Sequence, residues 1–378
     1  MKDIAIYIHI PFCISKCYYC DFTSFPNMKD KLDEYIDYLL KELTLYKERI
    51  IDFNIKTIFI GGGTPSYIPG EHIYKILNYI YKNFNTSKLE EITIEANPGT
   101  LNKEKVSIYS SLGINRVSMG VQTLDNSLLK AIGRCHKVED FYNSYYLLRK
   151  KDIKNINVDL MFGLPNQNLK DVINSLKEAI NLGVEHISYY SLILEEGTLI
   201  NKWYEEGSIT LPSEDEERKM YHEAIEFLKS NGYNHYEISN FAKEGYECLH
   251  NLFYWKVKPY LGVGLSSHSN LAGKRFWNSS SFNIYYEKLK EGEFPVEGEE
   301  QIFKEIEMGE YCILGLRLIE GINKNEFRNR FNIDIENIYK DVINKHIKNG
   351  LIYENKGFIK LTNKGLDLSN LVEVDFLP

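Results

Sequence analysis

AIYIHIPFCISKCYYC, residues 5–20, joins a strand-like segment directly to three closely spaced cysteines. Cys13, Cys17 and Cys20 follow one another with the spacing C-x3-C-x2-C. Three thiolates on one short loop can converge on a single inorganic core, and soft sulfur ligands suit iron–sulfur clusters and zinc. The segment therefore predicts a metal centre at the carboxyl end of the first strand.

The choice of metal depends on a fourth ligand. A structural zinc site needs four ligands, and the other three cysteines lie more than a hundred residues further along the chain. Three ligands to a four-iron cluster would leave one iron open for an exogenous ligand. We therefore favour a [4Fe–4S] cluster over zinc and over three unrelated buried thiols.

Strand-like runs alternate with helix-like runs through the first half of the chain. We expect strands at 4–10, 57–60, 92–96, 116–121, 155–161 and 186–192. The helix-like runs between them cover 29–50, 71–84, 102–112, 139–151 and 169–182. This α/β alternation predicts a parallel sheet with crossover helices, as a barrel or as a doubly wound sheet.

The regular alternation of strand-like and helix-like runs ends after residue 198. Ser213 is a candidate N-cap for a helix to about residue 230, because Glu216 stands three residues on, as in a capping box. Beyond about residue 303 the pattern is helical again and ends in two strand-like pieces, 351–354 and 357–361. We expect a core domain over 1–230, a linking segment over 231–300, and a small winged-helix-like module in an α+β region over 301–378.

Composition narrows the functional classes. The net charge of −8 argues against a nucleic-acid groove. The sequence contains no run of 18 apolar residues, so we expect no membrane span. The first ten residues lack the features of a signal peptide. We expect a cytoplasmic protein whose six cysteines are thiols or metal ligands rather than disulfides. Peripheral membrane contact and oligomeric state stay open.

Several polar or glycine residues lie in or just beyond the expected strands. Gly61, Gly62, Gly63 and Thr64 follow the second strand, and glycines let backbone amides approach a ligand closely. The others are Glu95, Asn97, Gln122, Arg134 and Asp159. Each alone could be a solvated loop residue or a helix cap. Together they lie mostly at the carboxyl ends of parallel strands, where such sheets build their sites.

These motifs resemble the radical S-adenosylmethionine (radical SAM) family, and within it the oxygen-independent coproporphyrinogen oxidase branch. The resemblance covers nearly the whole chain and implies a partial (β/α)6 barrel. It also implies that S-adenosylmethionine chelates the open iron and can be cleaved to a 5′-deoxyadenosyl radical. The residues that match positions around this first S-adenosylmethionine are Tyr7, Gly62 and Glu95. Those that match a second site are Tyr19, Gly63, Thr64, Gln122, Arg134 and Asp159, with Ile193 and His268 matching loosely.

Two departures separate this chain from the oxidases of the branch. The oxidases continue past the third cysteine with Gly-Cys and carry an N-terminal arm, whereas here Asp21-Phe22 follows Cys20 and the first strand starts near Met1. Cys-Asp-Phe resembles the heme chaperones of the branch. His250 in HNLFYW, residues 250–255, matches their H-N-x-x-Y-W motif, which implies contact with heme. The other interpretation of His250 is a histidine within an aromatic core.

The resemblance thus implies a heme chaperone that delivers heme to a respiratory apoprotein and takes electrons from a donor. Two alternatives remain: an oxygen-independent coproporphyrinogen III oxidase and a reductive heme-opening relative. Whether the chain catalyses any net radical reaction stays open.

Overall fold

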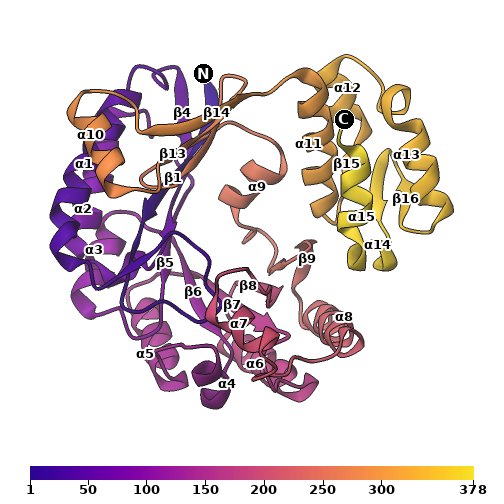
Figure 1. The fold of residues 1–378 in the computed structure, drawn as a ribbon, viewed down its shortest axis with the longest axis horizontal. Coiled ribbons are helices and arrows are strands. Elements are labelled where there is room, and N and C mark those ends of the chain that lie inside the picture. Colours follow the sequence, from indigo (N-terminus) through magenta and orange to yellow (C-terminus); the bar gives the residue numbers. More distant parts are fainter.

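The computed structural model describes all residues from Met1 to Pro378. A twelve-stranded sheet dominates the larger part of the molecule, in the order β14-β13-β12-β11-β1-β4-β5-β6-β7-β8-β10-β9. A smaller module, drawn in yellow and orange in Figure 1, packs to one side of it. No helix in the structure is both long enough and apolar enough to span a bilayer.

Six parallel strands form the centre of the sheet and confirm the six strands expected from the sequence. They are β1 (Lys2–Ile10), β4 (Phe53–Gly62), β5 (Glu91–Ala96), β6 (Arg116–Gln122), β7 (Asn155–Phe162) and β8 (His186–Ser191). The crossover helices are α1 (Leu32–Tyr46), α2 (Gly70–Asn83), α3 (Lys103–Ser111), α4 (Asn126–Ala131), α5 (Val138–Arg149) and α6 (Leu169–Leu182). These βα units confirm the predicted partial barrel.

The two faces of each central strand carry different chemistry. In β1, isoleucines at positions 4, 6, 8 and 10 are fully buried in a core that includes residues of α1 and α2. The period-2 alternation of a strand therefore turns Tyr7 and His9 to the opposite, inner face of the sheet. The same alternation turns Glu91, Thr93 and Glu95 of β5 inward, because Ile92 and Ile94 lie in the core. The inner face is consequently polar.

Residues 231–300, expected as a linking segment, contribute to the large sheet. They supply β9 (Asn234–Glu237), β10 (Asn240–Ala242), β11 (Tyr260–Val263), β12 (His268–Leu271), β13 (Lys274–Asn278) and β14 (Val296–Gln301). Strand β11 pairs in parallel with β1, and the other five extend the sheet in antiparallel fashion at both ends. These residues show little regular periodicity because their strands are only three to six residues long. Their side chains share one core with the barrel.

Four further helices belong to this part of the molecule. They are α7 (Leu199–Glu205), α8 (Glu214–Ser230), α9 (Leu249–Trp255) and α10 (Phe282–Lys290). The capping box predicted for α8 is present: the Ser213 Oγ accepts from the Glu216 N–H, and the Glu216 carboxylate accepts from the Ser213 N–H at 2.9 Å. Helix α9 lies between the sheet and the smaller module (Figure 1).

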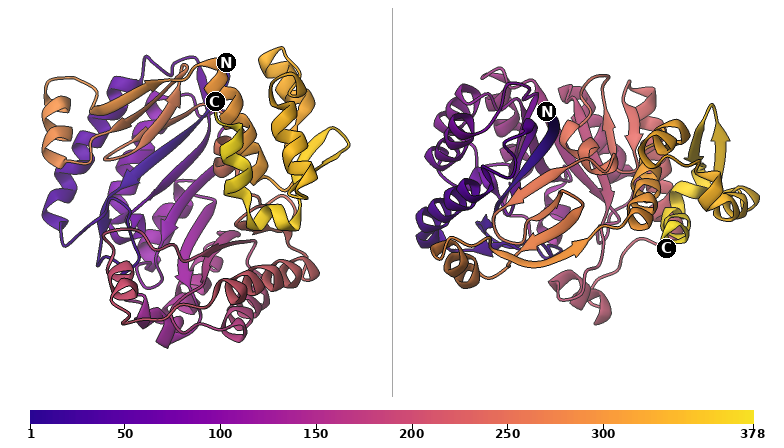
Figure 2. Two further views of the ribbon diagram at one scale, coloured as in Figure 1. Left: turned by 45° about the vertical axis from the view of Figure 1, so that its right-hand side comes forward. Right: turned by 90° about the horizontal axis from the view of Figure 1, so that it is seen from above.

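Residues 304–376 form the smaller module, with a hydrophobic core of its own. It contains α11 (Lys304–Arg317), α12 (Lys324–Phe331), α13 (Glu336–Lys348), α14 (Asn363–Asp367) and α15 (Ser369–Glu373). A three-stranded sheet, in the order β15 (Ile322–Asn323), β17 (Phe358–Leu361) and β16 (Ile352–Asn355), completes it. Helices followed by a small hairpin match the expected winged arrangement, and Figure 2 shows this hairpin projecting from the helices.

The module docks through polar contacts to β9, α8 and α9. The Ile238 N–H donates to the Arg317 carbonyl at 3.0 Å, and the Arg317 guanidinium lies 3.6 Å from the Glu237 carboxylate. Arg317 also lies over the Trp255 ring, 4.4 Å from its centroid. Asp367 of α14 accepts from His222 of α8 at 2.9 Å. The module thereby holds one side of α9.

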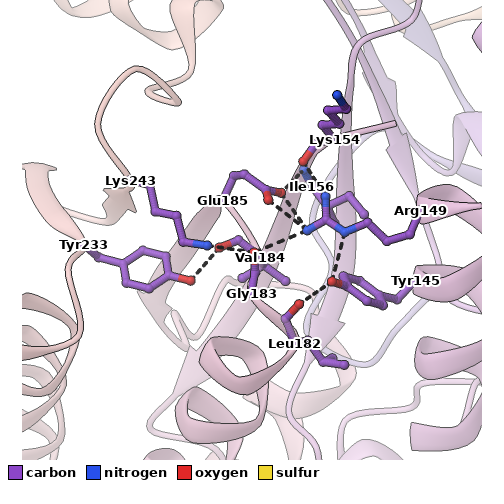
Figure 3. A network of polar contacts seen from close by, with 10 residues as sticks. All are labelled: Tyr145, Arg149, Lys154, Ile156, Leu182, Gly183, Val184, Glu185, Tyr233 and Lys243. Atoms are coloured by element: carbon purple, nitrogen blue, oxygen red, sulfur yellow. Dashed lines mark hydrogen bonds and ion pairs between the residues drawn. The ribbon is translucent and has the colours of Figure 1, made fainter. Parts of the chain in front are cut away.

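A polar network secures the amino ends of β7 and β8 (Figure 3). Arg149 at the end of α5 donates to both carboxylate oxygens of Glu185, each at 2.9 Å, and its Nε donates to the Tyr145 hydroxyl. Glu185 also accepts from the Ile156 N–H at 3.1 Å. Charge-assisted hydrogen bonds in a partly desolvated pair of this kind are stronger than those in an exposed pair. The network ties α5 to both strands.

We expect Glu185→Gln to lower the free energy of unfolding by about 2 kcal/mol, because it leaves the partly buried Arg149 without its charged acceptor. The matched control is Glu206→Gln, which removes an exposed i,i+4 pair with Lys202 and should cost less than about 0.5 kcal/mol. Urea unfolding followed by circular dichroism measures both. Equal losses for the two variants would contradict a special role for the Arg149–Glu185 pair.

Candidate metal and cofactor site

The cysteine loop leaves β1 at its carboxyl end and is held from several sides. Cys13 ends the two-residue strand β2 (Phe12–Cys13), which pairs with β3 (Phe25–Pro26). A turn joins the other two cysteines, with the Cys20 N–H donating to the Cys17 carbonyl at 3.2 Å. The Tyr18 carbonyl accepts from the N–H of Ile200 in α7 at 3.0 Å. The three thiols are therefore displayed on a braced loop.

A chain of hydrogen bonds links the first two cysteines through the strand ends. Arg134 donates to the Cys17 Sγ at 3.4 Å and to the Asn97 Oδ1 at 2.7 Å. Asn97 donates to the Thr64 Oγ1 at 3.0 Å, and Thr64 donates to the Cys13 Sγ at 3.6 Å. The chain brings residues that follow β4, β5 and β6 to the same edge of the sheet as the cysteines. Hydrogen bonds to sulfur are a means of tuning an iron–sulfur cluster.

The glycine motif after β4 packs directly under this loop. The Gly63 N–H donates to the Ile10 carbonyl at 2.9 Å, and the Thr64 N–H donates to the Phe12 carbonyl at 2.8 Å. A Cβ on Gly63 would lie 2.9 Å from the Cys13 Sγ. Gly62 has φ +118°, a conformation that side chains rarely adopt, and its N–H donates to the Glu95 carboxylate at 3.0 Å. Glycine is required here because loop and strand touch.

Tyr7 and His9 connect the inner face of β1 to the same loop. The His9 Nε2 lies 2.9 Å from the Thr23 carbonyl, which can only accept, so Nε2 carries the proton. The Nδ1 then accepts from the Tyr7 hydroxyl at 3.0 Å. Burial lowers the pKa of His9 and keeps the ring neutral. His9 thus orients Tyr7 and fixes the end of the cysteine loop.

Two carboxyl groups on the inner face are shifted toward their protonated forms. Burial raises the pKa of Glu95 to about 8, with a further rise from the negative charge of Asp159. Burial also raises the pKa of Asp159, which accepts from Asn157 at 2.6 Å. A ligand that offers positive charge or hydrogen-bond donors would stabilise the ionised forms of these two carboxyl groups. Such clustering of shifted acids is typical of binding sites.

His250 lies in the interior at the start of α9 and is only 1% exposed. Its Nδ1 pairs with the Thr57 hydroxyl and its Nε2 with the Tyr254 hydroxyl, both at 2.8 Å. Burial, followed by the positive charge of Arg116, lowers the pKa of His250 to about 3. In this conformation neither ring nitrogen is free to bind a metal.

Glu91 at the start of β5 anchors the same helix. Its carboxylate accepts from the N–H groups of Leu249 and His250 at 2.9 and 3.1 Å, and from the Cys248 thiol at 3.6 Å. A carboxylate at these first amides satisfies donors that the helix itself leaves unpaired. The contacts hold α9 against the inner face of the sheet.

Two family models and several curated proteins match this chain. Residues 7–179 match the Radical SAM superfamily, and residues 304–368 match the HemN C-terminal domain. The heme chaperone HemW of Lactococcus lactis is 37% identical over 379 residues, covering 100% of this chain and 98% of the relative. HemW of Bacillus subtilis is also 37% identical, with 99% of each chain covered. The chain belongs to the HemW family.

More distant members and a solved structure agree with this assignment. HemW of Escherichia coli is 31% identical and covers 99% of this chain and 98% of the relative. The structure of coproporphyrinogen III oxidase (HemN) from Escherichia coli matches with a TM-score of 0.86 and 21% identity. It covers 99% of this chain and 90% of that chain, so it establishes the same fold for this HemW-family protein.

The donor set fits the [4Fe–4S] cluster that the radical SAM family implies. All three thiols are free, and the absence of a side chain at Gly63 lets the strand end approach Cys13 without displacing its sulfur. No three His, Cys, Asp or Glu side chains surround a single ion position. A cubane cluster takes one thiolate at each iron, so it does not need three sulfurs on one ion. The match to the Radical SAM superfamily therefore implies a [4Fe–4S] cluster and S-adenosylmethionine as cofactors.

The structure brings most of the residues singled out from the sequence to one region. Tyr7, Gly62, Gly63, Thr64, Glu95 and Arg134 are linked to the cysteine loop by the contacts above. Gln122, with φ +69°, ends β6 and accepts from the Tyr190 hydroxyl at 2.9 Å. Tyr19 lies beside Arg134, whose positive charge opposes the rise in the Tyr19 pKa caused by burial.

The two loosely matched residues, Ile193 and His268, take no part in these contacts. Ile193 is an exposed side chain after β8, with 66% of its surface accessible. His268 begins β12 and stacks on Trp277 of β13 at 5.7 Å. Neither makes a hydrogen bond or ring contact with the cysteine loop.

Two further residues of this region were not singled out from the sequence. Glu91 anchors α9. Arg116 is 2% exposed and its Nε has no partner. The signal that could have found Glu91 and Arg116 is the alternation of charged and apolar residues in β5 and β6, which marks a polar inner face.

Proposed function

We propose that this protein is a heme chaperone that binds heme, a [4Fe–4S] cluster and S-adenosylmethionine, and delivers the heme to respiratory apoproteins in the cytoplasm or at its membrane boundary. The observation that carries the proposal is full-length similarity to HemW heme chaperones, at 37% identity over 98% of one relative. An electron donor for the cluster belongs to the same proposal.

Cys13, Cys17 and Cys20 would hold the cluster, each as a thiolate on one iron. The fourth iron would take S-adenosylmethionine, which supplies radical chemistry when it is bound and reduced. Tyr7, Gly62 and Glu95 would contact that first molecule. The remaining candidates, Tyr19, Gly63, Thr64, Gln122, Arg134 and Asp159, would line a second site. The position of Glu95 supports this assignment, because its carboxyl accepts from the Gly62 N–H at 3.0 Å on the inner face, next to the glycine motif.

His250 would be the axial ligand of heme. That role requires α9 to move, or at least Tyr254 to turn away, because the Nε2 of His250 is paired with the Tyr254 hydroxyl at 2.8 Å. Helix α9 is short, and its anchors are the Glu91 carboxylate and the Arg317–Trp255 contact. Loading and release of heme would then be coupled to the position of α9 beneath the C-terminal module.

Anaerobic heme titration of the reconstituted protein tests this proposal. We expect His250→Ala to lose the Soret band of the axially ligated complex. We expect Tyr254→Phe to bind heme about fivefold more tightly, because it removes a hydrogen bond of about 1 kcal/mol that competes for Nε2. Tyr260→Phe is the matched control, since it removes a nearby hydroxyl that does not contact His250.

Identical spectra and affinities for wild type and His250→Ala would remove His250 from the heme site. A separate anaerobic assay with coproporphyrinogen III, S-adenosylmethionine and reductant addresses catalysis. Formation of protoporphyrinogen IX would overturn the chaperone proposal in favour of the oxidase. Retention of heme and its transfer to an apocytochrome, without decarboxylation, would support it.

A further inference from the structure

Arg116 is a buried cation that this conformation leaves without a partner. It begins β6, is 2% exposed, and its guanidinium makes no hydrogen bond and no ion pair. Arg134, beside the cysteine loop, donates by contrast to acceptors on Cys17, Asn97 and Gly120. Buried charges in proteins are nearly always paired, because an unpaired one is costly. The unused guanidinium of Arg116 therefore indicates a partner that another arrangement of the chain supplies.

Glu91 is the carboxylate placed to become that partner. Glu91 and Arg116 both lie on the inner face of the sheet, because their neighbours Ile92 and Val117 lie in the core. The register pairs Arg116 with Thr93, so Glu91 is its diagonal neighbour on β5. Diagonal neighbours on one face of a sheet lie about 7–8 Å apart, a distance that long side chains bridge. Arg116 can therefore reach the Glu91 carboxylate by a change of side-chain conformation.

Glu91 is at present committed to α9. Its carboxylate accepts from the N–H groups of Leu249 and His250 at 2.9 and 3.1 Å, and from the Cys248 thiol at 3.6 Å. Burial opposes the charged form of Arg116, but the acidic groups of Cys248 and Glu91 nearby outweigh it and raise the pKa of Arg116. The carboxylate thus has two sets of donors within reach. It uses the start of α9 and leaves the guanidinium unpaired.

Ligation of heme by His250 requires this arrangement to change. Both ring nitrogens are occupied, one by the Thr57 hydroxyl and the other by the Tyr254 hydroxyl. A turn of α9 that frees the ring would also draw the first amides of the helix away from Glu91. The carboxylate would then be buried without donors, which is costly. An ion pair with Arg116 would satisfy both charges at once.

We propose that Arg116 is a positioning residue for heme ligation, which takes over the Glu91 carboxylate when α9 turns to free His250. The inference rests on the proposed heme chaperone function and on His250 as the axial ligand. Arg116 touches neither heme nor the cluster, and it acts through Glu91 on the position of α9. The heme-free state carries an unpaired charge, whereas the heme-bound state gains an ion pair.

Thermal unfolding of the heme-free protein and anaerobic titration with ferric heme, both on the reconstituted full-length chain, test this inference with Arg116→Met. The variant should unfold at the wild-type temperature or above it, because it removes an unpaired buried charge. It should bind heme about tenfold more weakly, with a smaller Soret band of the axially ligated form, because Glu91 has no second partner. Arg116→Lys keeps the charge and should recover most of the heme affinity.

The matched control is Arg149→Met, which removes a guanidinium that is already paired with Glu185. This control should unfold at a lower temperature and keep the wild-type affinity for heme. A fall in both unfolding temperature and heme affinity in Arg116→Met would show a merely structural role and overturn the proposal. In a Glu91→Gln background, Arg116→Met should have no further effect on heme affinity. An effect that persists there would also overturn the proposal.

Heme dimethyl ester, in which both propionates are esterified, separates this role from direct contact with the ligand. Because Arg116 acts through Glu91, we expect Arg116→Met to weaken the binding of heme and of the ester equally. Weakening confined to heme would indicate an ion pair between the guanidinium and a propionate, and would overturn the proposal. Heme affinity that Arg116→Met leaves unchanged would overturn this inference alone. No binding of heme by the wild type would overturn the proposed function with it.

Discussion

Replacing Cys13, Cys17 or Cys20 by alanine is expected to abolish the [4Fe–4S] cluster. A site with three protein ligands that already leaves one iron open has no spare thiolate. Cys248 and Cys312 are buried in other parts of the fold, and Cys135, which follows Arg134, is exposed. Iron and sulfide content after anaerobic reconstitution should fall to background, and the charge-transfer absorption of the cluster should disappear. Reductive cleavage of S-adenosylmethionine should be lost with it.

Cys312→Ala is the matched control for this prediction. Cys312 is a fully buried free thiol in the core of the C-terminal module, away from the cysteine loop. Its replacement should lower stability by about 1 kcal/mol through the lost packing and leave cluster content unchanged. Full iron content in any one of the three cysteine-loop variants would contradict the ligand assignment for that residue.

Gly63→Ala is expected to damage the cluster site almost as severely without removing any ligand. The new Cβ would lie 2.8 Å from the Phe12 carbonyl oxygen and 2.9 Å from the Cys13 Sγ. One of these neighbours is backbone and the other is a candidate ligand, so relief requires the loop to move away from β4. We expect iron content below half of the wild-type value and a loss of about 2 kcal/mol in unfolding free energy, typical of an overpacked contact.

Gly245→Ala separates steric conflict from the general effect of replacing glycine. No atom lies within 4 Å of a Cβ at position 245, although its φ of +79° carries a conformational cost. This variant should lose about 1 kcal/mol of stability and keep its full cluster content. Wild-type iron content in Gly63→Ala would show that the loop tolerates displacement and would contradict the tight packing described above.

In this HemW-family protein the residues of the candidate cluster site are already in contact, whereas His250 is not free to ligate heme. The cysteine loop, the glycine motif and the Arg134 chain form one connected arrangement, whereas both nitrogens of His250 are occupied. Under the proposed function, the cluster can be assembled before heme is bound. Heme ligation then depends on breaking the contact between His250 and Tyr254.

Local patterns were sufficient to predict the six parallel strands, the crossover helices and the capping box of α8. Alternating isoleucines in β1 and the Ser213–Glu216 spacing act over a few residues, so the sequence carries them directly. The cysteine spacing likewise predicted the metal site. Strands β9–β14 were harder, because a strand of three to six residues shows little periodicity and gains its stability from its neighbours in the sheet.

Contacts between distant segments were decided only by the tertiary structure. Asn97 acquires its place between Thr64 and Arg134 because three strand ends meet at one edge. Glu91 and His250, 159 residues apart, meet because α9 folds back over the inner face. Sequence by itself determined which residue types stand at each strand end, through local periodicity and spacing. Which of these residues touch, and that both ring nitrogens of His250 are paired, follows from long-range packing that no local pattern contains.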